Sequence, residues 1–168
     1  GEGWFVVNVA DARWLTTEGS EKRTSGSELP FESEEAPFEQ LGVRIHVLLP
    51  GESNGWYHEE SQQEDFLVLS GECLLLVEGE ERRLKQWDFF HSPAGTEHIF
   101  VGAGDGPCAI FMVGARSAEW TVRYPVSEVA ARHGASVEHE QTGFDEVYTG
   151  WAPSRPGSPS YWDKLPWA

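Results

Sequence analysis

The sequence lacks several features of secreted and membrane proteins. Of its 168 residues only Cys73 and Cys108 are cysteines, too few for a disulfide framework, and both lie in apolar, strand-like segments. We therefore expect two reduced, buried cysteines in a cytoplasmic protein. The sequence also lacks an apolar run of about 18 residues, which a membrane-spanning helix requires. No signal-like segment follows residues 1–3, so we expect no membrane partner.

Basic residues are also scarce. There are 12 lysines and arginines against 28 aspartates and glutamates, which gives a formal net charge of −16. A chain of this charge repels nucleic acid and anionic lipid, so we expect neither of them as a partner. We expect the ligand to be a small molecule. The same charge is consistent with a role in solubility or with adaptation to high salt, so it indicates no particular function.

Short apolar segments at regular spacing fill the middle of the chain, where we expect one barrel domain over 41–115. Residues 42–49 alternate in polarity and end at Pro50 and Gly51. Six similar segments follow, separated by turns rich in glycine, proline and acidic residues: 65–70, 73–77, 82–85, 88–91, 99–101 and 108–113. Strands this short and evenly spaced are typical of an all-β sandwich or jelly roll.

The regions on either side of the barrel differ from it in composition. Residues 1–40 are expected to form an N-terminal arm and an acidic loop, with an edge strand over 4–9 and loop over 11–40. Residues 116–168 are expected to form a C-terminal extension with one short helix over 127–133. A disordered tail has little use for aromatic residues. We expect six of them to attach an extended arm to the barrel or its neighbour rather than to form a ligand pocket: Phe144, Tyr148, Trp151, Tyr161, Trp162 and Trp167.

Several predicted strands are apolar on both faces, namely residues 65–70, 74–77 and 109–113. Continuous apolar runs mark strands that are covered on both sides, whereas a barrel alone covers only the inner side. The outer cover comes either from the terminal arms or from a second copy of the chain. We predict a homodimer.

One short segment brings three candidate metal donors together. His58 and Glu60 are two residues apart, so on an extended strand both side chains point to the same face. The polar residues 61–63 can turn the chain back toward Glu64. A fourth donor is His98, which follows a Pro-x-Gly turn at the start of another apolar strand.

The spacing of these residues resembles the two motifs of the cupin family. The first motif reads Gly, five residues, His-x-His, three or four residues, Glu, six residues, Gly, and residues 58–71 fit its spacing. The second reads Gly, five residues, Pro-x-Gly, two residues, His, three residues, Asn, and Pro93, Gly95 and His98 fit it. The resemblance implies a jelly-roll barrel whose subunits commonly pair. Four positions depart from the motifs: Gly51 lies one residue early, Glu60 replaces His, Trp87 replaces Gly and Gly102 replaces Asn.

The resemblance also implies one divalent metal ion, bound by His58, Glu64 and His98 with Glu60 as the fourth donor. Two imidazoles and two carboxylates suit zinc, iron, manganese or nickel without selecting among them. If Glu60 does not bind, the other three form a two-His, one-carboxylate set that leaves positions open for substrate and oxygen. Glu60 is then a candidate catalytic general base.

Other polar and aromatic residues near the motifs have alternative readings. Gln63 is expected at the rim of the site. Arg44 and His91 either line the barrel mouth or face outward, and Trp56 either walls the pocket or packs in the core. The remaining histidines are assigned to the surface or the core: His46, His133 and His139.

Two functions are compatible with this site. The first is an enzyme in which the metal binds and polarises a small oxygenated substrate, for a dioxygenase-like cleavage or an isomerisation. The second is a non-enzymatic module in which the metal or the pocket holds a small ligand or braces the barrel. The fold does not decide between them, but a free metal position beside a roomy pocket favours the enzyme.

Overall fold

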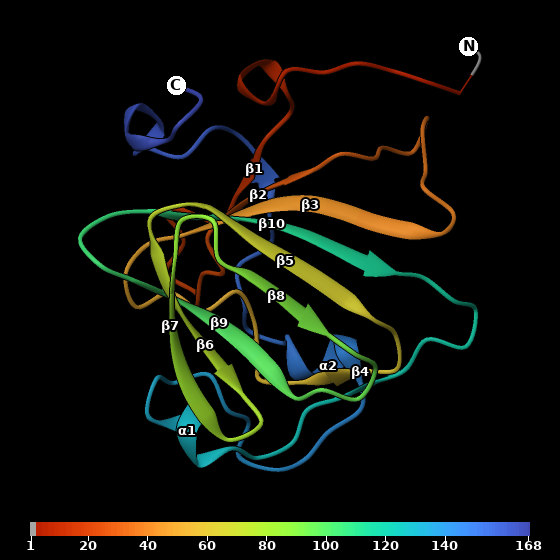
Figure 1. Ribbon diagram of the computed structural model, residues 1–168, viewed down its shortest axis with the longest axis vertical. Coiled ribbons are helices and arrows are strands. Elements are labelled where there is room, and N and C mark those ends of the chain that lie inside the picture. Colours follow the sequence, from red (N-terminus) through yellow and green to blue (C-terminus); the bar gives the residue numbers. More distant parts are fainter. Residues whose placement is uncertain (1–2) are drawn as a thin grey trace.

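The computed structural model describes residues 3–168 and consists mainly of strands, which confirms the all-β prediction (Figure 1). The strands are β1 (Leu15–Thr16), β2 (Ser27–Pro30), β3 (Leu41–Leu48), β4 (Glu59–Glu60), β5 (Glu64–Ser70), β6 (Glu72–Val77), β7 (Glu80–Lys85), β8 (Phe89–Ser92), β9 (His98–Ala103), β10 (Cys108–Ala115), β11 (Val122–Arg123) and β12 (Arg155–Pro156). Short helical turns are α1 (Glu128–Ala131), α2 (Phe144–Val147) and the 3-10 turns Val9–Asp11 and Trp162–Lys164.

The strands form a jelly-roll barrel from two main sheets (Figure 1). The larger sheet has the order β12-β1-β2-β3-β10-β5-β8, the smaller has the order β7-β6-β9, and β4 pairs separately with β11. Buried side chains from both sheets meet in one inner cluster, including Phe66 and Ile110 from the larger sheet and Phe100 from the smaller. Cys73 and Cys108 belong to this cluster, and both are free and buried as expected.

The outer faces of both sheets are covered by the chain's own terminal segments. Successive strand residues point to opposite faces, so each apolar strand also presents side chains outward. On the larger sheet, Trp14 and Tyr161 pack against Ile45 in a second buried cluster. On the smaller sheet, Val129 of α1 packs against Ile99 of β9. At these two faces the cover comes from the terminal arms, one of the two predicted alternatives, while the homodimer stays a prediction.

The terminal segments contain more regular structure than the sequence predicts. The expected loop over 11–40 contains β1 and β2, and β12 from the tail pairs with β1 at the edge of the larger sheet. The edge strand expected over 4–9 is wrong: residues 4–8 have no strand assignment, and a 3-10 turn follows. The edge of the sheet beside β1 is formed by β12 instead, and Trp4 and Val6 are 76% and 90% exposed.

The predicted helix over 127–133 is confirmed in a shorter form as α1. Ser127 caps it, because its hydroxyl accepts a hydrogen bond from the amide of Ala130 at 3.3 Å, and Gly134 ends it with φ of +66°. The expectation of one helix is wrong, since α2 follows in the tail. The cap of α2 is Gly143, which has no side chain to signal a helix start. In the part of the chain that the structure describes, no helix is long and apolar enough to cross a membrane.

Two turns in the barrel occur at glycine positions of the cupin motifs. The chain keeps the glycine in one of them and replaces it with tryptophan in the other. Gly71, between β5 and β6, has φ of +75°, and a Cβ there would lie 2.3 Å from the carbonyl oxygen of Pro107. No other residue type fits that position without backbone movement. Trp87 stands where the motif has glycine, yet its φ is +74°. The chain therefore keeps the left-handed turn before β8 despite the replacement.

Candidate metal centre

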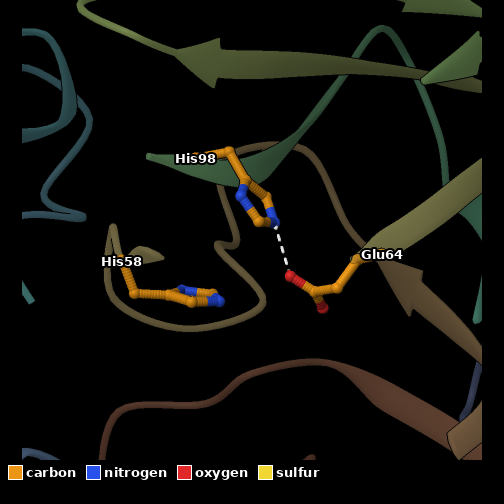
Figure 2. Close-up of side chains that lie close together, drawn as sticks. All are labelled: His58, Glu64 and His98. Carbon is orange, nitrogen blue, oxygen red and sulfur yellow. Dashed lines mark ion pairs between the residues drawn. The ribbon is translucent and has the colours of Figure 1, made fainter. Parts of the chain in front are cut away.

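Three of the four predicted donors lie together inside the barrel (Figure 2). His58, Glu64 and His98 each offer one ligand atom, and these atoms all lie within 4.8 Å of one another. Glu64 begins β5 and His98 begins β9. The backbones of His58 and His98 are joined by two hydrogen bonds of 3.1 and 2.8 Å. Strand pairing, rather than a flexible loop, therefore sets the separation of the two imidazoles.

The hydrogen bonds of both histidines suit metal binding. Nδ1 of His58 donates to the carbonyl oxygen of Trp56 at 2.7 Å, and Nδ1 of His98 donates to the carbonyl oxygen of Thr96 at 3.0 Å. A carbonyl oxygen can only accept, so it fixes the proton on Nδ1 and leaves Nε2 as the free donor atom. Metal-binding histidines are oriented by such backbone partners. The residues present therefore fit a divalent ion.

Burial and mutual charge determine the protonation of the three groups. Burial, followed by the charge of His98, lowers the pKa of His58 to about 4, so this imidazole is neutral at pH 7. Burial alone would lower the pKa of His98, but the hydrogen bond and charge of Glu64 outweigh it and raise that pKa. Nε2 of His98 lies 3.3 Å from Oε2 of Glu64. Burial opposes ionisation of Glu64 as well, but the contact with His98 lowers the pKa of this carboxyl group.

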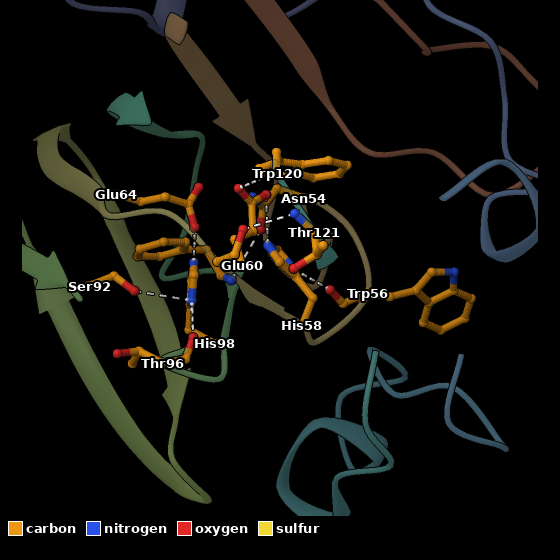
Figure 3. A network of polar contacts seen from close by, with 12 residues as sticks. Asn54, Trp56, His58, Glu60, Glu64, Ser92, Thr96, His98, Trp120 and Thr121 are labelled. Carbon is orange, nitrogen blue, oxygen red and sulfur yellow. Dashed lines mark hydrogen bonds and ion pairs between the residues drawn. The ribbon is translucent and has the colours of Figure 1, made fainter. Parts of the chain in front are cut away.

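Glu60 lies beside these three donors but is not one of the group (Figure 3). Its Oε1 is 3.7 Å from Nε2 of His58, and its Oε2 accepts a 2.7 Å hydrogen bond from the indole nitrogen of Trp120. Burial, and then the charge of Glu64, raises the pKa of Glu60. Its role as a fourth ligand or as a base stays a prediction, because its oxygens face both the donors and the indole.

Arg123 joins the two donor-bearing segments from outside the site. Its guanidinium forms ion pairs of 2.8 Å with Glu59, 2.8 Å with Glu97 and 2.9 Å with Glu140. Glu59 follows His58 in the chain, and Glu97 precedes His98. Sequence reasoning did not find Arg123, since no fixed spacing relates a residue in the C-terminal extension to these glutamates. The arginine therefore bridges the residues that neighbour the two histidines.

The donors face a cavity of about 970 Å³ that is lined from both the barrel and the C-terminal extension. The extension contributes a wall of five aromatic residues, which we call the aromatic wall: Trp120, Tyr124, Phe144, Tyr148 and Trp151. Three of the six tail aromatics, Phe144, Tyr148 and Trp151, thus line the cavity, and the expectation that they form no ligand pocket stays a prediction. Tyr161, Trp162 and Trp167 pack on the outer sheet face as expected.

Sequence reasoning also missed Trp120 and Tyr124, although a signal for them was present. Trp120, Val122 and Tyr124 alternate with polar residues, as in a half-buried strand, and β11 lies within this stretch.

Trp56 packs in the core: its indole nitrogen donates to the carbonyl oxygen of Val147 at 2.8 Å. The aromatic wall therefore rests on the core behind it.

The other candidate residues divide between the cavity and the surface. Arg44 and His46 point inward from β3 and line the cavity. Nε2 of the buried His46 donates to the carbonyl oxygen of Ser25 at 2.5 Å. His91 and Gln63 lie on the exposed side, where both bond the carboxylate of Asp65. The last two histidines are at the surface: His133 contacts Glu81, and His139 is exposed.

Comparison with known proteins gives one family and several related folds. Residues 44–114 match the model of the Cupin_2 family, described as a cupin domain. A sugar phosphate isomerase of the cupin superfamily from Silicibacter pomeroyi is 23% identical, with a TM-score of 0.60 over 70% of this chain and 80% of that chain. The polyketide cyclase RemF from Streptomyces resistomycificus is 15% identical, with a TM-score of 0.57 over 67% and 79%. A cupin protein from Bacteroides fragilis is 18% identical, with a TM-score of 0.51 over 71% and 88%.

A search of curated protein sequences finds no significant match to the chain. At these identities the solved structures establish the fold alone. The matched region begins in β3 and ends in β10, so it contains all four predicted donors and the strands that carry them. The motif spacing, the jelly-roll topology and the family match agree, and residues 44–114 form a cupin domain.

Proposed function

We propose that this cupin is a metal-dependent enzyme that acts on a small oxygenated molecule, by a dioxygenase-like or an isomerase-like reaction. The observation that supports this is the position of His58, Glu64 and His98, whose free donor atoms face a cavity large enough for a substrate. A divalent ion held there supplies Lewis-acid polarisation of a substrate oxygen, with positions left open by a two-His, one-carboxylate set. Zinc, iron, manganese and nickel all suit these donors.

The chain's own residues supply positioning and proton transfer in this proposal. The carbonyl oxygens of Trp56 and Thr96 hold the two imidazoles in the tautomer that leaves Nε2 free. Glu60 is the proposed general base, because one of its oxygens lies 3.7 Å from Nε2 of His58 and burial raises its pKa, which makes the carboxylate a stronger base. The indole of Trp120 holds one oxygen of Glu60 and leaves the other directed toward the donors. The alternative, in which Glu60 is a fourth ligand, closes the site and favours the non-enzymatic module.

Elemental analysis of protein purified without a metal-affinity step tests the metal site. We expect about one divalent ion per chain in the wild type, loss of the ion in His98→Ala, and retention in the matched control His133→Ala, whose imidazole contacts Glu81 at the surface. Loss of the ion in Glu60→Ala makes Glu60 a ligand, whereas full occupancy makes it a base or a support. A wild-type protein that binds no ion under metal-replete conditions contradicts the proposal.

A second measurement separates the enzyme from the non-enzymatic module. With Mn²⁺ as the bound ion, an open position exchanges water, which raises the relaxation rate of solvent protons. The enzyme predicts a raised relaxation rate that falls when a substrate displaces the water. A rate no higher than that of the metal-free protein, measured after unbound Mn²⁺ is removed, indicates a closed site and supports the module. Oxygen uptake during turnover then separates a dioxygenase from an isomerase.

We also propose that the protein is a cytoplasmic homodimer. Two free, buried cysteines support the compartment. Support for the dimer comes from β8, an edge strand of the larger sheet on which Phe89 is 62% exposed, preceded by Trp87 at 66%. Exposed apolar side chains at an unpaired edge favour association. Light scattering should give twice the chain mass of 18.8 kDa, and a monomer mass rejects the dimer.

A further inference from the structure

The aromatic wall and the charges around the cavity indicate the class of the ligand. We propose that it is a planar, fused-ring compound that carries neighbouring oxygen atoms on one edge and no phosphate group. Its rings pack against the aromatic wall, and its oxygen-bearing edge faces His58, Glu64 and His98. This inference rests on the proposed metal site, since the metal position gives the oxygen atoms their partner.

The wall is a continuous series of rings that starts at a metal donor. The ring centroids of His58 and Tyr124 are 5.9 Å apart, those of Tyr124 and Tyr148 are 6.0 Å apart, and those of Tyr148 and Phe144 are 4.9 Å apart. All three separations lie within the range of about 4.5–7 Å in which aromatic pairs attract. A flat ligand that reaches from the donors toward the rim therefore has a ring beside it along its length.

Two members of the wall keep apolar surface exposed at the cavity. Phe144 is 53% exposed and Trp120 is 39% exposed, and both line the cavity. The indole of Trp120 cannot turn freely, because its nitrogen is bonded to Glu60. Exposed aromatic surface beside a metal position is what an aromatic ligand would cover. The preset orientation of the indole reduces the entropic cost of stacking.

The tyrosines of the wall offer ring faces rather than free hydroxyl groups. The rings of Tyr124 and Tyr148 meet edge to face, with centroids 6.0 Å apart. The Tyr148 oxygen accepts a 3.2 Å hydrogen bond from the backbone amide of Trp56. A ligand rich in hydroxyl groups along its whole length, such as a sugar, would meet mainly ring carbons along this wall. A ligand with a polar edge and an apolar body matches the wall better.

The charges at the cavity argue against a phosphate group. Arg44 and Arg116 line the cavity, but Arg44 pairs with Glu28 at 3.1 Å, and Arg116 pairs with both oxygens of Glu32. A phosphate group recruits guanidinium groups through two parallel hydrogen bonds, and here a carboxylate occupies both nitrogens of the Arg116 fork and one nitrogen of Arg44. Within the described residues, four carboxylates also line the cavity: Glu28, Glu60, Glu64 and Asp145. A dianionic group would have to displace a carboxylate and face the others.

The volume agrees with this class of ligand. About 970 Å³ lies at the upper end of the range of roughly 300–1,000 Å³ for pockets that bury drug-sized molecules. A monocyclic sugar would leave much of the aromatic surface in contact with water. A molecule of two or more fused rings would bury it.

Calorimetric titration of the zinc-loaded protein with 2,3-dihydroxynaphthalene, against glucose 6-phosphate, tests the inference. Zinc stoichiometry is measured first on the same samples. We expect the naphthalenediol to bind, and Phe144→Ala and Trp120→Ala each to raise its Kd about tenfold or more. Trp4→Ala is the matched control, because it removes an exposed aromatic ring outside the cavity. It should leave the Kd within about twofold.

The other outcomes overturn the inference in distinguishable ways. If zinc binds but glucose 6-phosphate binds more tightly, and Arg44→Gln weakens it, the ligand class is wrong while the proposed function stands. Equal affinity of the naphthalenediol for zinc-loaded wild type and for His98→Ala shows that its oxygen atoms do not face the metal position, which also overturns the inference. If zinc does not bind the wild type, both the inference and the proposed function are wrong.

Discussion

The barrel strands and the C-terminal extension present different chemistry to one cavity. The strands contribute ionisable groups, such as His58, Glu64 and His98, whereas the extension contributes rings and the arginine that holds the donor strands. The strand residues belong to the region that matches a family, and the extension lies outside it. A common barrel can therefore keep a metal site while the segment that covers its mouth sets which molecule reaches it.

Replacement of Trp14 should give the largest change in the free energy of unfolding. It tests whether the terminal segments are part of the stable fold. Trp14 is 2% exposed, and its ring centroid lies 5.5 and 5.3 Å from those of Trp162 and Trp167. We expect Trp14→Ala to lower the free energy of unfolding by about 3–5 kcal/mol, measured by chemical denaturation. Trp4→Ala, at a ring that is 76% exposed, should change it by less than about 0.5 kcal/mol. Equal values for the two variants would show that the barrel is stable without its cover.

Arg123 tests whether the extension affects the metal donors of the barrel. Replacement by glutamine removes the cation that joins Glu59 and Glu97. We expect Arg123→Gln to weaken metal binding by about 10- to 100-fold, as for other residues that orient metal ligands, in a competition assay with a chelator. Arg83→Gln, which breaks one exposed ion pair with Glu72, should leave the metal affinity unchanged. If Arg123→Gln binds the metal as tightly as the wild type, the C-terminal extension does not influence the metal donors of the barrel.

Gly55 tests how closely the extension fits the barrel. A Cβ at this position would lie 2.5 Å from the hydroxyl oxygen of Tyr148, so the ring must move. We expect Gly55→Ala to cost about 1–2 kcal/mol of unfolding free energy, at the lower end of the usual cost of overpacking. Gly106→Ala is the matched control, because nothing lies within 4 Å of its Cβ position. If the two variants unfold at the same denaturant concentration, the aromatic wall is not tightly seated.

Replacement of His46, a buried residue of the barrel, should give the smallest change in stability. Burial holds the pKa of His46 below its ordinary value, against the raising influence of Glu28. The unfolded chain therefore takes up a proton below about pH 6.5 that the folded protein excludes. This contribution to stability is present above pH 6.5 and is lost as the pH falls toward the folded-state pKa.

The corresponding variant should be less sensitive to acid. We expect His46→Gln, measured without metal, to reduce the loss of stability between pH 7.5 and 5.5 by up to about 1.4 kcal/mol. His139→Gln, at an exposed histidine, should follow the wild type. A His46→Gln curve that parallels the wild-type curve would mean that His46 takes up its proton over the same pH range in the folded and the unfolded chain.

The sequence predicted the donors better than the cavity. The spacing of residues along a strand determines the face of the sheet to which each side chain points. His58, Glu64 and His98 lie on or beside paired strands, where register fixes which face a side chain takes. Glu60 also points toward the site as its spacing from His58 predicts. The contact between Glu60 and Trp120 spans 60 residues of chain, and no periodicity relates the two. The path of the extension depends on packing against the whole barrel, which local pattern does not encode.

The ion pairs of Arg123 have a consequence for the lifetime of the folded extension. One guanidinium links Glu140 to the glutamates beside the two histidines, so any opening of the extension that frees Arg123 also loosens the donors. An ion that binds only the closed form lowers the population of the open form by a factor of one plus the ratio of the free ion concentration to its Kd, and cleavage of the extension by proteases slows by the same factor. Amide hydrogen exchange around residues 122–124 should accordingly become slower as metal is added.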